Sequence, residues 1–108
     1  MTWVFDATPL IYLAKSERLG VIETVSDPRL VPEAVYREVV TEEIEAGYDD
    51  VRRIERAAED GRLDVVEVDL DSSPVATRLE RHSGLSNADL AVLACADARD
   101  GVAVMDGA

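Results

Sequence analysis

The stretch Trp3-Val4-Phe5-Asp6-Ala7-Thr8-Pro9-Leu10-Ile11 determines the start of the fold, because it sets one acidic residue between an apolar run and a helix-forming segment. Residues Trp3 to Phe5 are apolar and strand-forming. Thr8 offers a hydroxyl cap and Pro9 suits the first helical position, which predicts a helix from Pro9 to Ser16. A strand, an acid at its carboxyl end and a helix therefore follow one another directly.

The rest of the chain repeats this alternation of short strands and helices. Caps, prolines and glycines predict strands at Arg29–Val31, Leu63–Val68 and Val102–Met105, a short segment at Glu17–Val25, and helices at Pro32–Ala46, Asp49–Glu59, Pro74–Arg81 and Ser86–Ala98. Alternating strands and helices imply right-handed crossovers and a mainly parallel sheet covered on both faces. We expect one domain, residues 1–108, with a three-layer α/β/α architecture.

The composition is strongly acidic. The net charge is −12 at pH 7, and Lys15 is the single lysine among 11 basic residues, a pattern typical of a salt-adapted, halophilic protein. Acidity argues against nucleic-acid binding, which usually needs a basic surface. A divalent cation can bridge carboxylates and phosphate, and concentrated salt weakens every protein's electrostatic grip on RNA. No apolar run is long enough for a membrane helix and no signal peptide is recognisable, so we expect a cytoplasmic protein without membrane contact.

Several chemistries find no support in the sequence. Cys95 is the only cysteine, which excludes an internal disulfide, and its apolar surroundings predict a buried thiol. His82 is the only histidine and falls in a predicted loop. There is no CxxC motif, no G-x-S-x-G motif and no glycine loop that would cradle a phosphate.

Two aspartates directly follow apolar strand candidates. Asp6 follows Trp3 to Phe5, and Asp106 follows Val102 to Met105. Parallel sheets place their sites outside the carboxyl ends of the strands, so both acids should emerge at one edge. The alternative for each residue alone is a turn former or a helix cap.

Two further acids lie on predicted helices. Asp89 shares a helix face with apolar residues, and its alternative role is a capping box with Ser86. Glu38 lies at the margin of the apolar stripe of its helix, with Glu42 one turn further along as its rival. The alternative for Glu38 is a solvated carboxylate that pairs with arginine.

Four converging carboxylates would have to share protons or bind a cation. Two unit charges about 5 Å apart repel by roughly 3 kcal/mol at an effective dielectric constant near 20. Oxygen-only ligands favour hard ions such as Mg²⁺ or Mn²⁺, and the reaction such a site supports is metal-assisted hydrolysis of a phosphodiester.

A cluster of arginines offers a different contact for RNA. Arg52, Arg53 and Arg56 occur together on one predicted helix and would suit phosphate groups. Surface pairing with Asp49 and Asp60, three or four residues away, is the preferred interpretation.

Four segments together resemble the PIN-domain family. They are Val4 to Ile11, Val31 to Val39, Ser86 to Ala94 and Val102 to Asp106. The resemblance implies that Asp6, Glu38, Asp89 and Asp106 are the catalytic and metal-binding acids, and that Thr8 is a substrate contact or supports the ligands. No hydroxyl or acid flanks Asp106, in contrast to the family's usual fourth segment.

The resemblance also implies a function. Its members are metal-dependent ribonucleases that cut single-stranded RNA, often as toxins of VapBC-type toxin–antitoxin pairs, usually dimeric and blocked by an antitoxin protein. We therefore expect an Mg²⁺- or Mn²⁺-dependent endoribonuclease that forms a homodimer. The family's last helix and strand are expected to be missing after Ala108. The rival expectation is a catalytically inactive PIN-like binding or dimerisation module, followed by an acidic metal-binding protein without nuclease activity.

Overall fold

A four-stranded, fully parallel sheet forms the centre of the molecule. The computed structural model describes residues 1–26, 28–41, 48–79 and 84–105. The strands are β1 (Trp3–Phe5), β2 (Arg29–Pro32), β3 (Asp64–Val66) and β4 (Val102–Val104). Their order in the sheet is β3-β2-β1-β4, so the first strand of the chain is an inner one.

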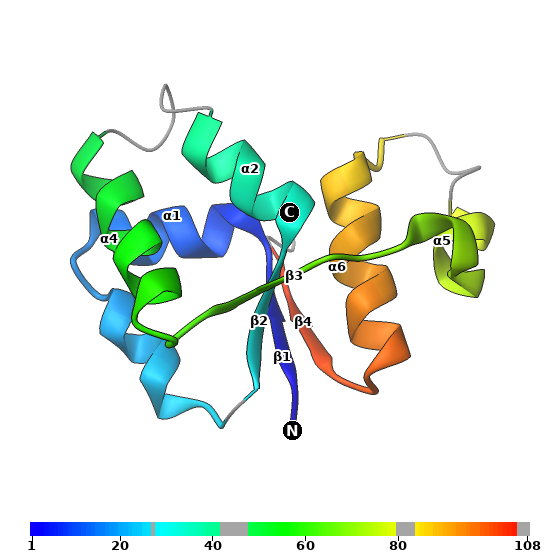
Figure 1. Ribbon diagram of the computed structural model, residues 1–108, viewed down its shortest axis with the longest axis horizontal. Helices are drawn as coiled ribbons and strands as arrows, with labels where there is room; N and C mark the ends of the chain where they lie inside the picture. The colour runs from blue at the N-terminus through cyan, green and yellow to red at the C-terminus, as the bar shows by residue number, and fades with distance from the viewer. Residues whose placement is uncertain (27, 42–47, 80–83, 106–108) are drawn as a thin grey trace.

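Helices cover both faces of this sheet, as expected for an α/β/α architecture. They are α1 (Ala7–Lys15), η1 (Leu19–Thr24), α2 (Glu33–Thr41), α4 (Tyr48–Glu59), η2 (Leu70–Ser72), α5 (Pro74–Leu79) and α6 (Asn87–Ala98). Figure 1 shows the sheet nearly edge-on, with α1 and α4 on one side and α5 and α6 on the other. No helix within the described residues is long and apolar enough to span a membrane.

The core lies between the inner strands and the helices that pack on them. Val4 of β1 and Val31 of β2 are completely buried. Helix α6 is apolar on nearly all sides because it is enclosed by the sheet, α2 and α5. Burial of Cys95 in this helix confirms the interpretation of the lone cysteine as a buried thiol.

Some predicted boundaries are wrong by one or two residues. Helix α1 begins at Ala7 and not at Pro9, because Asp6, rather than Thr8, acts as its N-cap. Pro32 does not open a helix but ends β2, and α2 starts at Glu33. The predicted ends of two helices, Ala46 and Arg81, lie outside the described residues.

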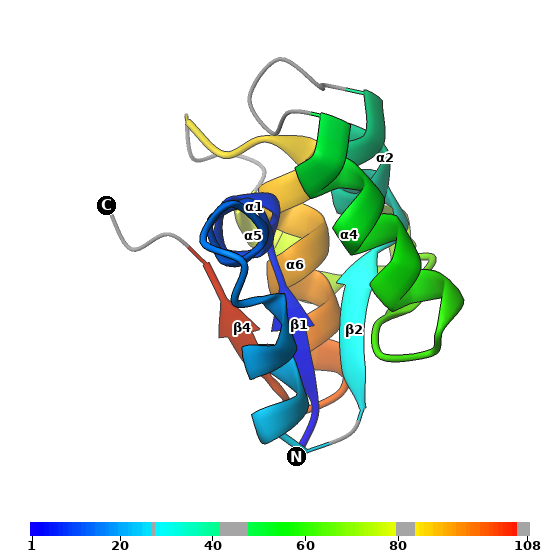
Figure 2. The same cartoon turned by 90° about the vertical axis from the view of Figure 1, so that its left-hand side faces the viewer.

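The carboxyl ends of the strands meet the starts of three helices at one edge of the sheet. Helices α1 and α2 begin directly after β1 and β2. Helix α6 precedes the parallel strand β4, so its N-terminus lies at the same edge, as Figures 1 and 2 show. This edge, called the carboxyl edge below, is where the sequence places its candidate acids.

Candidate acidic site at the carboxyl edge

Asp6 is the one buried charged or polar residue among the described residues, with 8% of its surface exposed. Its Oδ1 accepts a hydrogen bond of 2.8 Å from the amide of Ala7, the first residue of α1. Its own amide donates to the carbonyl oxygen of Val104 at 3.0 Å. The carboxylate therefore has a capping role, and its main chain is fixed between β1 and the end of β4.

Asp89 stands in the first turn of α6. Its amide donates to Oγ of Ser86 at 3.1 Å, and its Oδ2 accepts from the amide of Ser86 at 3.1 Å. These reciprocal bonds form the predicted capping box. The side chain of Asp89 is only half-buried, so it remains accessible to water.

Glu38 lies in the second turn of α2 and is also half-buried. Its neighbours Val35 and Val39 are buried against the core, which confirms that Glu38 borders the apolar stripe of the helix. Helix α2 packs against both α1 and α6. The rival ligand Glu42 lies outside the described residues.

Thr8 and Asp106 are the remaining candidate site residues. Thr8 is the second residue of α1, half-buried and two positions after Asp6. Asp106 lies outside the described residues. The chain does reach Met105 directly after β4, whose end is joined to Asp6 by the hydrogen bond to Val104.

The structure brings the acid-bearing elements together without closing a metal site. Asp6, Glu38 and Asp89 stand on three helices that pack at the carboxyl edge: α1 on α2, and α2 on α6. Within the described ranges, however, no group of three or more histidine, cysteine, aspartate or glutamate side chains is placed to hold a metal ion. The helices that carry or follow these three candidates are thus in contact, whereas convergence of their carboxylates on one metal stays a prediction.

A groove at the same edge escaped the sequence analysis. It has a volume of about 540 Å³ and lies between the ends of β2 and β3 and the starts of α2 and α6; its polar lining includes Glu33, Arg37, Glu67, Asp69 and Asn87. Arg37 pairs with Glu33 across one helical turn. The four-residue spacing of Glu33 and Arg37 is the one sequence signal that could have pointed to this groove. The approach of residues 67–70 to α6 leaves no local pattern in the sequence.

The fold and this edge define an α/β protein whose acidic residues gather where parallel strands end. A family model, DUF3368, described as a PIN domain, matches residues 2–108. The chain therefore belongs to the PIN-domain family, whose fold is generally that of nucleases. Neither the curated proteins nor the solved structures include a significant match to the chain.

Proposed function

We propose that this chain is a metal-dependent endoribonuclease that hydrolyses phosphodiester bonds of single-stranded RNA. The ligands would be Asp6, Glu38, Asp89 and Asp106, bound directly or through water to Mg²⁺ or Mn²⁺. The observation that carries the proposal is the burial of Asp6 at the carboxyl end of an inner strand in a PIN-domain chain.

The donor chemistry fits a hard cation, because all four side chains offer only oxygen. An ionised carboxylate has about four acceptor positions, so the cap bond to Asp89 Oδ2 leaves Asp89 able to bind a ligand as well. The described residues contain no complete ligand set. The proposal therefore requires Asp106 as a member.

A bound cation would stabilise negative charge on the phosphoryl and leaving oxygens of the substrate. The chain's own contribution is to hold its acids in place. Asp6 is fixed by the cap of α1 and by the sheet, and Asp89 by its capping box. Thr8, the second residue of α1, would support a metal ligand or contact the substrate.

RNA cleavage with Mn²⁺ in concentrated salt tests this proposal. Asp6→Asn should lower the rate at least about 100-fold, the upper range for changes in groups that merely support metal ligands. Asp64→Asn is the matched control, because Asp64 is an exposed acid at the amino end of β3. It should leave the rate unchanged. Equal cleavage by wild type and Asp6→Asn would trace the activity to a contaminant and remove the enzyme proposal.

A second candidate is a catalytically inactive PIN-like module that binds a partner or dimerises. It is favoured by the capping roles of Asp6 and Asp89, which give both acids a structural reason to be present. This candidate predicts no Mn²⁺-dependent cleavage in the wild-type chain. It also predicts full secondary structure and stability when both acids are replaced by asparagine, which remains a good cap.

The partner proposals rest on the family. A toxin of a toxin–antitoxin pair would arrest growth when it is produced alone in the cytoplasm, and an antitoxin protein would relieve the arrest. Asp6→Asn would abolish the arrest if cleavage causes it. A homodimer would be recognised by its mass in sedimentation equilibrium.

A further inference from the structure

Three arginines surround a second hollow that the proposed function does not use. The hollow has a volume of about 280 Å³ and is lined by Glu17, Leu19, Gly20, Arg53, Arg56 and Arg62. Its walls are the residues after α1, the start of η1, and the second half of α4 with the turn that follows. In Figure 1 these segments lie at the lower left, toward the amino ends of the strands and away from the carboxyl edge.

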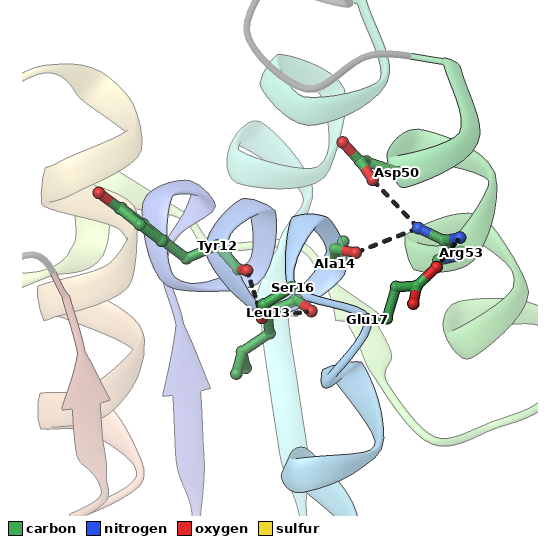
Figure 3. Close-up of polar contacts among 7 residues, drawn as sticks. All are labelled: Tyr12, Leu13, Ala14, Ser16, Glu17, Asp50 and Arg53. Atoms are coloured by element: carbon green, nitrogen blue, oxygen red, sulfur yellow. Dashed lines mark hydrogen bonds and ion pairs between the residues drawn. The ribbon is translucent and has the colours of Figure 1, made fainter.

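Three hydrogen bonds position Arg53 at this hollow. Its Nη1 donates to the carbonyl oxygen of Ala14 and to Oδ1 of Asp50, both at 3.2 Å, and its Nη2 donates to Oε1 of Glu17 at 3.2 Å. Figure 3 shows the guanidinium between the end of α1 and helix α4. The expected partners were Asp49 and Asp60, but Arg53 pairs instead with Asp50 and, across distant segments of the chain, with Glu17.

The other two arginines differ in what they contact. Arg62 pairs with Asp60 at 3.3 Å, and its carbonyl oxygen accepts a hydrogen bond from Arg29, which fixes the turn. Arg56 follows Arg53 by three positions and therefore shares its side of α4. The Arg56 side chain is exposed and makes no hydrogen bond or ion pair with any residue in the described part of the chain.

Glu17 already places an oxyanion against this arginine cluster. Its side chain is 75% exposed and contacts Arg53 only at the surface. Exposed pairs of this kind contribute little to stability, so a more highly charged oxyanion can displace Glu17. Glu17 also has a φ of 57°, in the left-handed region that ordinary residues rarely adopt. The residue is thus held in an unfavourable backbone conformation beside the cluster.

We propose that this hollow binds a phosphate group through Arg53, Arg56 and Arg62, in competition with the carboxylate of Glu17. Guanidinium groups match phosphate oxygens in paired hydrogen bonds. The volume of the hollow, about 280 Å³, lies just below the range of small-molecule sites, roughly 300–1,000 Å³, and suits a small group better than a large ligand. The phosphate belongs either to a free nucleotide or to an RNA strand. Only the RNA source rests on the proposed function.

Binding measured without divalent metal tests this inference. The probes are inorganic phosphate, adenosine 5′-monophosphate and a short single-stranded RNA, titrated in EDTA at low ionic strength and followed by calorimetry. Arg56→Gln should weaken binding about tenfold, as expected for loss of a charge-assisted hydrogen bond. Glu17→Gln should tighten it several-fold. Arg52→Gln is the matched control, because Arg52 is exposed on the same helix and does not line the hollow.

The results of these titrations test the phosphate site and not the proposed nuclease site. Binding of the nucleotide but not of RNA identifies a free nucleotide as the source. If RNA binds more tightly than the nucleotide, and Arg56→Gln weakens the binding of RNA, the source of the phosphate is an RNA strand. Failure of all three probes to bind, or equal affinities in wild type, Arg56→Gln and Glu17→Gln, would overturn the inference. Because EDTA removes the metal and Asp6→Asn should bind phosphate normally, this failure is distinguishable from failure of the nuclease proposal.

Discussion

The amide of Asp6 donates a hydrogen bond of 3.0 Å to the carbonyl oxygen of Val104. This bond joins the end of the first strand to the end of the last one described. Asp106 follows Val104 by two positions in the chain. The sheet itself therefore ties Asp6 to the end of β4.

The two roles of Asp6 can be separated by comparing two substitutions. Asp6→Asn keeps an oxygen that caps α1, whereas Asp6→Ala removes the acceptor for the amide of Ala7. Asp6→Ala should therefore unfold with a free energy about 1 kcal/mol lower than Asp6→Asn in urea titrations. Equal stability of the two variants would show that the cap contributes nothing.

Binding of Mn²⁺ should raise the free energy of unfolding. At a Mn²⁺ concentration of about 100 times its dissociation constant, the free energy of unfolding should rise by about 2.7 kcal/mol. Ser86→Ala should lose about 1 kcal/mol of stability but keep most of this Mn²⁺ effect. Asp89→Asn should lose the Mn²⁺ effect. If Asp89→Asn responds to Mn²⁺ like the wild type, Asp89 is a cap and not a ligand.

The thiol of Cys95 should be unreactive in the native protein. Burial raises the pKa of this thiol above its ordinary value of 9.0, although the nearby Arg99 acts in the opposite direction. Reaction with a thiol reagent at mildly alkaline pH should be at least about tenfold slower than in the unfolded chain. Because the chain has no other cysteine, the signal reports one site.

The same raised pKa sets the sign of a pH effect. The unfolded thiol ionises first, so its contribution to stability is complete below pH 9.0 and is lost as the pH rises through the higher pKa of the folded state. Cys95→Ala should remove this part of the alkaline slope in the free energy of unfolding. An unchanged slope would contradict the assignment.

The close approach of Gly101 to β1 should make this position intolerant of a side chain. A Cβ there would lie 2.7 Å from the carbonyl oxygen of Thr2, which accepts the hydrogen bond that starts β4. Gly101→Ala should destabilise the fold by about 1–3 kcal/mol. Gly20→Ala is the control, since its nearest contact would be a flexible glutamate oxygen at 3.7 Å, and it should be close to neutral.

Helices and strands that are bounded by clear capping or turn residues were predictable from the sequence. Strand β1 occupies the predicted residues Trp3–Phe5, and α6 runs to Ala98 as expected from its capping residues and apolar composition. The start of α1 was predicted wrongly. A carboxylate that directly follows a strand can cap the next helix. Asp6 is the N-cap of α1, so the helix begins at Ala7 and the hydroxyl of Thr8 does not cap it.

The sites were less predictable than the elements. Alternation of strands and helices placed Asp6 at the carboxyl edge, but the sequence could not choose between its capping and ligating roles. The groove beside Asn87 and the contact of Arg53 with Glu17 join residues far apart in the chain. Such contacts depend on how helices pack, and no local pattern encodes them.

A crystal structure grown with Mn²⁺ and examined by anomalous scattering tests the central claim most directly. The account predicts a manganese peak at the carboxyl edge, with carboxylate oxygens of Asp6 and Asp89 at roughly 2.0–2.3 Å or joined to it through water. A well-ordered crystal at saturating Mn²⁺ with no metal at that edge, while Asp6 only caps α1, would contradict it.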